Sequence, residues 1–153
     1  MEMFADDVAV IEKGAGVFEA EVSANWSVND NPNGGYLMAI LVHAMTEHSD
    51  KRSTPIVTAN YISRCVPGKA EVRLEEVSRS TQFNRYDARL IQDGKEKIRA
   101  LGTFTVEKPE CTDNRYETGA PDLVPVESCV RIPELPKYTL FHNLDMRLDP
   151  SCA

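Results

Sequence analysis

The segment that most constrains the fold is a loop-forming run that leads directly into an apolar helix. Residues 29–35 read Asn-Asp-Asn-Pro-Asn-Gly-Gly, a composition typical of turns and of helix N-caps. Residues 36–45 are almost all apolar, and Leu37, Ile40 and Leu41 recur at helical spacing. Further apolar side chains extend this surface around the helix. We therefore predict a helix that begins at the two glycines and is buried on more than one face.

Beyond residue 53 the apolar pattern alternates, and β-branched and aromatic residues become frequent, which predicts strands. The expected strands are 17–22 before the helix, and 55–64, 70–75, 83–92 and 97–107 after it. Short connections between the later strands, such as the hairpin signal Asp93-Gly94, predict antiparallel neighbours. One long helix packed against such a sheet is an α+β fold.

Composition excludes several classes of protein. With 153 residues, of which 42% are hydrophobic, the chain can bury one core. Its net charge of -7 repels phosphate backbones and no basic run offsets it, so nucleic acid is not an expected partner. Acidic residues stand at the start where a secretory signal needs basic ones, and no apolar run approaches the roughly 18 residues of a membrane span. We therefore expect a soluble, cytoplasmic protein with no membrane span.

The cysteines do not form a pattern typical of a metal site. Cys65, Cys111, Cys129 and Cys152 form no Cys-x-x-Cys pair and have no histidine at ligand spacing. We interpret them as incidental thiols rather than as a zinc site or a disulfide framework. The sequence also has no glycine-rich phosphate loop and no nucleophile-elbow motif. The expected chemistry therefore uses neither a metal nor a cofactor.

The last third of the chain departs from this pattern. Prolines interrupt residues 108–137, which predicts a linker or an arm. Apolar and polar residues then alternate over 138–148, which predicts a further strand. The expected organisation is a main domain over 1–107, a proline-rich linker or arm over 108–137, and an additional strand with a tail over 138–153. The pattern leaves open whether this strand pairs with the main sheet, pairs with another chain or begins a second unit.

Several of these residues together resemble the thioesterase-like hotdog superfamily. They are Trp26, Pro32-Asn33-Gly34-Gly35-Tyr36-Leu37, Tyr61, Pro67-Gly68, Ser80, and Leu90-Ile91-Gln92 with Gly94. The resemblance spans about Val17 to Val106, and more narrowly it is to the amino-terminal half of a double-hotdog (TesB-like) acyl-CoA thioesterase. It implies a hotdog fold, in which an antiparallel sheet wraps a long central helix. It also implies an acyl-CoA substrate and a homodimer or larger homo-oligomer, because hotdog sites typically form between two units.

The same resemblance bears on the final segment and on activity. Residues 138–148 stand where the first strand of a second hotdog unit would begin, so the chain resembles half of a double unit. In double-hotdog thioesterases the catalytic Asp, Thr and Gln lie in the second unit. The resemblance therefore implies that this chain lacks those three residues.

Thioester hydrolysis needs hydrogen-bond donors for the developing oxyanion and a group that activates water. The backbone amides of Gly34, Gly35 and Tyr36 are candidate donors, because glycine lets a carbonyl approach the start of a helix. The alternative is that Asn33 caps the helix and the glycines pack against a strand. For the base, the resemblance offers the loop before the helix or a position two turns into it. The helix has no acid there, so Asp30 is the candidate base, with Asn33 orienting water; a turn role for Asp30 is the alternative.

The remaining candidates would contact substrate. Ser80 and Gln82 stand at a strand start, where they could line the cleft, and Tyr61 could shape the acyl tunnel. Arg79 could meet the CoA phosphates, although exposed basic residues on strands are usually only solvated. The leading hypothesis is a thioesterase-like protein that hydrolyses or binds an acyl thioester at a hotdog dimer interface. The alternative is a non-catalytic acyl-CoA-binding or assembly module.

Overall fold

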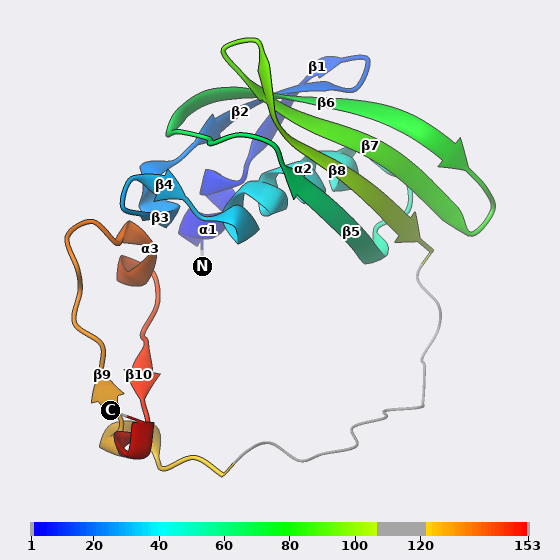
Figure 1. The fold of residues 1–153 in the computed structure, drawn as a ribbon. Helices are drawn as coiled ribbons and strands as arrows, with labels where there is room; N and C mark the ends of the chain where they lie inside the picture. The colour runs from blue at the N-terminus through cyan, green and yellow to red at the C-terminus, as the bar shows by residue number, and fades with distance from the viewer. Residues whose placement is uncertain (1, 107–121, 153) are drawn as a thin grey trace.

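A computed structural model describes residues 2–106 and 122–152, in which a curved antiparallel sheet arches over one long helix (Figure 1). The strands lie in the order β1-β2-β6-β7-β8-β5, and every neighbouring pair is antiparallel. Their bounds are Val10–Gly14 for β1, Val17–Val22 for β2, Ser53–Tyr61 for β5, Gly68–Arg79 for β6, Phe83–Gln92 for β7 and Lys95–Thr105 for β8. The helices of this part are α1 (Glu2–Asp7) and α2 (Gly34–His48).

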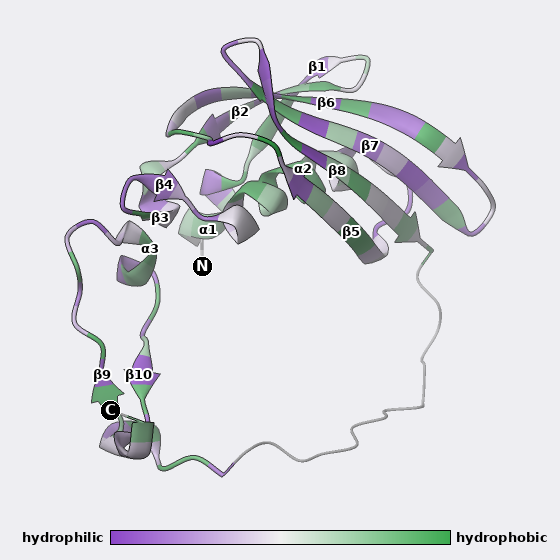
Figure 2. Ribbon diagram, in the orientation of Figure 1, coloured by the Kyte–Doolittle hydropathy of each residue, from purple (hydrophilic) through white to green (hydrophobic). Residues whose placement is uncertain are grey.

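Alternation along the strands decides which side chains face the helix. β7 buries every second residue from Asn84 to Gln92, and β2 buries Phe18 and Val22 in the same way. Figure 2 shows the resulting alternation of hydrophilic and hydrophobic residues along the sheet. The outward face carries charged residues that pair with one another, as expected for a solvent-exposed face. The predicted strands 17–22 and 83–92 are confirmed at their bounds by β2 and β7.

Two features of the sheet differ from the expectation. β5, which follows the helix, pairs with β8 at the far edge, so it does not lie beside its successor β6. β6 pairs instead with β2. The connection after β5 therefore crosses to the other half of the sheet, which the short-connection rule does not predict. β1 was also not predicted, because it is a short edge strand whose side chains are mostly exposed.

The predicted helix is confirmed as α2, which runs across the inner face of the sheet. Its buried residues are Tyr36, Leu37, Ile40, Leu41, Ala44 and Met45. They pack on inward side chains of the sheet, including Val72, Tyr86 and Phe104, in one continuous core. Met38 and Val42, on the side of the helix away from the sheet, are only half-buried. The residues that the structure describes leave this apolar strip of the helix incompletely covered.

The described C-terminal residues 122–152, called the arm below, comprise short elements only. They are the 3₁₀ turn η2 (Val126–Ser128), β9 (Val130–Arg131), α3 (Thr139–His142), β10 (Arg147–Leu148) and the 3₁₀ turn η3 (Pro150–Cys152). β9 and β10 pair with each other as a two-stranded antiparallel ladder. In Figure 1 this ladder lies away from the main sheet, whereas α3 lies beside residues 24–28, in the loop that precedes α2. Within residues 2–106 and 122–152, no helix is long and apolar enough to cross a membrane.

The strand predicted over 138–148 is wrong for most of its length. Residues 139–142 form α3, and only Arg147–Leu148 is strand. One helical turn brings Thr139 close to Asn143, and both side chains hydrogen-bond to the same loop of the main unit. In an extended strand these two side chains would be about 13 Å apart, so the loop contacts favour the helix. Part of the expected linker, 107–121, lies outside the described residues.

Candidate functional site

A tight hairpin precedes the long helix and contains the candidate base. The 3₁₀ turn η1 (Ala24–Trp26) leads into β3 (Ser27–Val28) and β4 (Asn31–Pro32), which pair with each other. The connecting residues Asn29 and Asp30 have φ of 51° and 60°, the left-handed pair that a two-residue hairpin needs and that Asn and Asp tolerate. The turn role considered for Asp30 is therefore present. Its side chain is exposed, and its carbonyl accepts a hydrogen bond from Arg64 Nη2 at 3.1 Å.

Asn33 is the N-cap of α2, as the alternative interpretation of the sequence expected. Its Oδ1 accepts hydrogen bonds from the amides of Gly35 at 2.8 Å and Tyr36 at 3.3 Å. Its own amide donates to the carbonyl of Trp26 at 2.8 Å. Two of the three amides predicted to bind an oxyanion are thus engaged by a neutral side-chain oxygen. A thioester oxygen could take its place only if the Asn33 side chain moved.

Tyr61, a candidate substrate contact, lies at the start of α2. Its hydroxyl donates to the carbonyl of Gly34 at 2.6 Å. A Cβ added at Gly34 would lie 3.1 Å from this hydroxyl oxygen, so the close approach favours glycine there. The Tyr61 side chain is half exposed, and burial of the other half raises the pKa of its phenol. Tyr61 therefore combines an accessible ring with a fixed hydroxyl.

The side chain of Tyr36 points into the protein rather than toward a substrate. Its hydroxyl donates to the carbonyl of Asp7 and accepts from the amide of Ser23, both at 2.8 Å. Burial raises the pKa of this phenol. The ring stacks on Trp26, whose indole Nε1 donates to the Asp7 carboxylate at 2.8 Å. Only the backbone amide of Tyr36 lies at the helix start.

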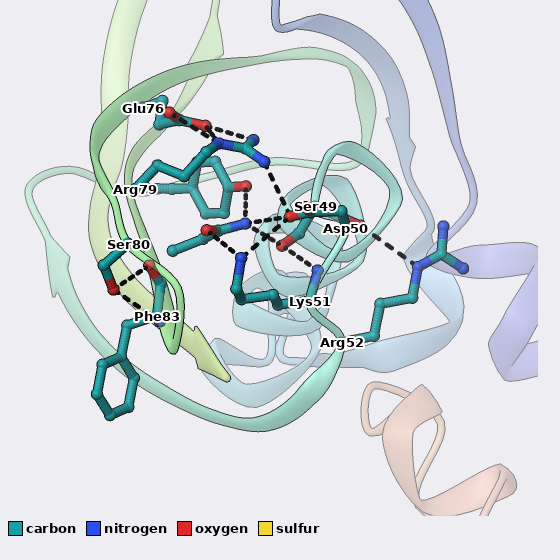
Figure 3. A network of polar contacts seen from close by, with 10 residues as sticks. Ser49, Asp50, Lys51, Arg52, Glu76, Arg79, Ser80 and Phe83 are labelled. Atoms are coloured by element: carbon teal, nitrogen blue, oxygen red, sulfur yellow. Dashed lines mark hydrogen bonds and ion pairs between the residues drawn. The ribbon is translucent and has the colours of Figure 1, made fainter. Parts of the chain in front are cut away.

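The other candidate residues lie at the opposite end of α2. Arg79 pairs with Glu76 and with Asp50, which follows the C-terminal end of the helix (Figure 3). Ser80 closes the turn between β6 and β7 by accepting from the amide of Phe83 at 2.9 Å. A helix of 15 residues is about 22 Å long. Within one chain, the structure therefore does not bring Arg79, Ser80 and the neighbouring exposed Gln82 to the helix start.

A buried polar cluster at this second end was missed by the sequence analysis. Asn84, fully buried, accepts from Lys51 Nζ at 3.0 Å and donates to the Asp50 carboxylate at 2.5 Å. Lys51 is only 8% exposed. The hydrogen bond from Asn84, together with the nearby Arg79 and Lys51 charges, lowers the pKa of Asp50. A sequence signal existed, because Asn84 occupies an inward position of a strand whose next inward residues, Tyr86, Ala88 and Leu90, are hydrophobic.

The described cysteines form no metal-binding site, and the environment of Cys65 does not favour reactivity. Cys65 is buried, and burial raises the pKa of its thiol, which disfavours the reactive thiolate. Cys129 and Cys152 are unpaired thiols in the arm, while Cys111 lies outside the described residues. Over 2–106 and 122–152, no group of three or more His, Cys, Asp or Glu side chains is arranged to hold a metal ion.

Two open cavities lie away from the start of α2. The larger one, of about 660 Å³, is open and lies along β1, β2, β6 and β7, with charged residues of both signs in its lining. The smaller, of about 390 Å³, adjoins Asp50, Lys51 and Arg52 at the C-terminal end of α2.

Comparison with protein families gives a match to the acyl-CoA thioesterase N-terminal domain over residues 22–105. This range extends from the end of β2 to the end of β8 and includes the hairpin and the long helix. A comparison with curated protein sequences finds no matching relative.

Solved structures share the fold at low sequence identity. A candidate thioesterase II from Thermobifida fusca is 20% identical, with a TM-score of 0.84 over 97% of this chain and 55% of its own. A protein of unknown function with a hot dog fold, from Alicyclobacillus acidocaldarius, is 18% identical, with a TM-score of 0.78 over 93% of this chain and 53% of its own. An acyl-CoA thioesterase II from Mycobacterium marinum is 10% identical, with a TM-score of 0.62 over 82% of this chain and 46% of its own.

These likenesses confirm the predicted α+β hotdog fold, in which the sheet wraps the central helix. The chain spans about half the length of the three solved structures.

Proposed function

The chain belongs to the family of acyl-CoA thioesterase N-terminal domains, and from this premise we propose that it binds acyl-CoA and takes part in hydrolysis of the thioester. The family match over residues 22–105 is the observation that carries the proposal. The geometry at the start of α2 supports it, because the exposed Gly35, the close-packed Gly34 and the accessible Tyr61 meet there.

In the proposed mode of binding, the thioester carbonyl lies at the start of α2. The helix dipole favours negative charge there, and preorganised amides stabilise an oxyanion as it develops. The acceptor that now occupies the amides of Gly35 and Tyr36 is the uncharged Asn33 Oδ1. Exchange of this oxygen for the thioester oxygen would free Asn33 to orient the attacking water. Asp30, exposed at the hairpin tip, is the proposed base.

We propose that the working form is a homodimer or larger homo-oligomer. β5 is a terminal strand of the sheet, and Ile56 on it is 68% exposed. The half-buried Met38 and Val42 leave the outer strip of α2 apolar. Terminal strands and apolar strips of this kind are usually covered by a partner. If β5 of a second copy paired antiparallel with β5 of the first, Arg79 of the second copy would lie toward the start of α2 in the first copy.

This arrangement would also account for the distance between the two groups of candidate residues. In one chain Arg79, Ser80 and Gln82 lie about one helix length from Asn33. In a two-fold dimer, each site would take the helix start from one copy and the turn between β6 and β7 from the other. We propose Ser80, Gln82 and Arg79 as substrate contacts on this basis, with Arg79 meeting the CoA phosphates.

For the organisation of the chain, we propose a hotdog unit over 1–107, a linker or arm over 108–137, and a C-terminal segment over 138–153. Similarity to the Thermobifida fusca structure covers 97% of this chain and 55% of that one. This agrees with the amino-terminal half of a double-hotdog protein, although the C-terminal segment contains a short helix in place of the predicted strand.

A second candidate function is a non-catalytic acyl-CoA-binding or assembly module. The placement of Asp30 favours it, because this residue sits in a solvent-exposed turn whose conformation alone explains its presence. Two turns into α2, the positions of Val42 and His43 supply no carboxylate. A site of this kind would bind the thioester without an effective base.

Assays of the full chain with short-, medium- and long-chain acyl-CoAs separate these functions. We expect release of free CoA, and we expect Asp30→Asn to lower kcat by about a hundredfold if Asp30 is the base. Asp93→Asn is the matched control, because Asp93 also has a left-handed backbone, φ 51°, in a two-residue turn but lies in the β7–β8 connection. Equal losses in both variants would remove Asp30 from the mechanism.

Binding without turnover, measured by calorimetry on the same substrates, would favour the non-catalytic module. Neither binding nor turnover on any chain length would overturn the proposed function.

A further inference from the structure

The arm contacts the main unit where α3 lies beside η1 and β3 (Figure 1). This place is the loop that leads into the start of α2. The contacts include hydrogen bonds from four residues of the segment 137–143, which are Lys137, Tyr138, Thr139 and Asn143. We call this segment the loop clamp.

Thr139 makes the central contact. Its Oγ1 accepts a hydrogen bond from the amide of Ser27 at 3.0 Å and lies 2.5 Å from the carbonyl oxygen of Ala24, to which the hydroxyl donates. One hydroxyl therefore satisfies a donor and an acceptor of the loop at the same time. Ser27 is 3% exposed, so loss of this hydroxyl would leave a buried amide without its partner.

Three other contacts extend the attachment in both directions along the loop. Asn143 Nδ2 donates to the carbonyl of Asn25 at 2.8 Å. The carbonyl of Lys137 accepts from the amide of Asn29 at 2.7 Å, at the first residue of the hairpin turn. The Asn29 side chain also approaches the hydroxyl of Tyr138 at 3.3 Å. The clamp thus holds the loop from Ala24 to Asn29.

The clamped loop is joined directly to the helix start. The carbonyl of Trp26, between the clamped residues Asn25 and Ser27, accepts from the amide of Asn33. Asn33 in turn caps Gly35 and Tyr36. A shift of the loop would therefore move the cap and the amides proposed to meet the thioester.

We propose that the loop clamp, residues 137–143, positions the 24–33 loop and thereby the substrate end of α2. Thr139 and Asn143 are positioning residues that act through Ser27 and Asn25 rather than on the substrate. This inference rests on the proposed acyl-CoA binding at the helix start. The arm would then complete a site in the main unit from more than one hundred positions away in sequence.

The test compares Thr139→Val with Thr139→Ser in the full chain. Valine keeps the shape of the side chain and removes the hydroxyl, whereas serine keeps the hydroxyl. The control is His142→Ala, because His142 lies in α3 but is exposed. Hydrogen exchange reports the amides of Ser27 and Asn29, which bond directly to the clamp. Titration with a medium-chain acyl-CoA measures the affinity of the proposed site at the start of α2.

Thr139→Val is expected to speed exchange at Ser27 and Asn29 about tenfold and to weaken acyl-CoA binding about fivefold, since one buried hydrogen-bond partner is lost. Exchange in β7 and the main unfolding transition should stay unchanged. Thr139→Ser should restore wild-type values, and His142→Ala should retain them. Asn143→Ala removes a separate contact. It should speed amide exchange in the loop and weaken acyl-CoA binding by smaller factors than Thr139→Val.

Unchanged exchange in the loop of Thr139→Val would overturn the clamp. Faster exchange with unchanged acyl-CoA affinity would overturn its link to the site. If the wild-type chain binds no acyl-CoA, the proposed function fails, and the exchange data still decide whether the clamp holds the loop.

Discussion

At the scale of single residues, Gly102 marks where α2 lies against the sheet. A Cβ added to Gly102 of β8 would overlap the Sδ atom of Met45 and lie 3.1 Å from Phe104 Cε2. Met45 and Phe104 are both fully buried. Close packing between α2 and the sheet therefore favours glycine at position 102.

We predict that Gly102→Ala lowers the free energy of unfolding by about 1–3 kcal/mol, the usual cost of overpacking a core. Denaturant titration measures this cost. In a Met45→Ala background the overlap is gone, so the same glycine replacement should cost much less. An equal cost in both backgrounds would show that the Met45 contact is not the cause.

Asp50 gives a prediction for the pH dependence of stability. The hydrogen bond from Asn84, aided by the charges of Arg79 and Lys51, lowers the pKa of Asp50 below its ordinary value of 3.8. A lowered folded-state pKa means that the ionised carboxylate stabilises the fold above pH 3.8 and that this contribution is lost as the pH falls through the lower value.

Asp50→Asn keeps an oxygen that can accept from Asn84 but cannot titrate. We therefore expect the variant to lose less stability than the wild type when the pH falls from about 5 to about 3. Urea titrations over this range measure the difference. Asp122→Asn, at an exposed position, is a control whose pH profile should follow that of the wild type. Parallel profiles for wild type and Asp50→Asn would contradict the prediction.

Residue identities in the sequence indicated some of these roles and missed others. Asn33 as a cap and Asp30 as a turn residue follow from local backbone preferences. The partnership of Lys51 with Asn84 joins residues 33 positions apart. No local preference encodes such a pair, so only the fold reveals it.

At the scale of elements, the start of α2 carries both stability and the proposed site. We expect Asn33→Ala to lower the free energy of unfolding by about 0.5–2 kcal/mol, because two helix amides lose their acceptor. Asn33→Asp keeps an acceptor and should remain close to the wild type in stability. Thermal and denaturant unfolding measure both variants.

The variants Asn33→Ala and Asn33→Asp also distinguish helix capping from the proposed replacement of the Asn33 oxygen by the thioester oxygen. An aspartate charge would hold the amides of Gly35 and Tyr36 more strongly, so Asn33→Asp should bind acyl-CoA more weakly while remaining folded. Unchanged affinity in this stable variant would argue against a substrate oxygen at these amides.

Element prediction succeeded where the local pattern agrees with packing in the fold and failed where contacts with distant segments decide the conformation. The alternation in β7 and the apolar run in α2 match the residues that helix and sheet bury against each other. Over 138–148 the alternation misled, because contacts of Thr139 and Asn143 with a distant loop determine the local conformation. The place of β5 at the far edge was equally hidden, since it depends on pairing across the whole sheet.

At the scale of the whole molecule, the proposed dimer has a direct test. Light scattering coupled to size exclusion should give a mass above that of the 17.1 kDa chain. Val42→Glu places a charge on the apolar strip of α2 and should shift the mass toward the monomer. The matched control is Val77→Glu on β6, because Val77 is 58% exposed and lies away from β5. A monomeric wild type would contradict the proposal.

The loop before α2 is attached on both sides to segments that are far apart in sequence. Asp7 binds Trp26 from one side, and Thr139 binds Ser27 from the other. During synthesis all six strands of the sheet can have left the ribosome once β8 is made. The contacts of Thr139 cannot form until at least 34 further residues, from 106 to 139, have been added. The loop therefore cannot complete its contacts until after the surrounding core can already have closed.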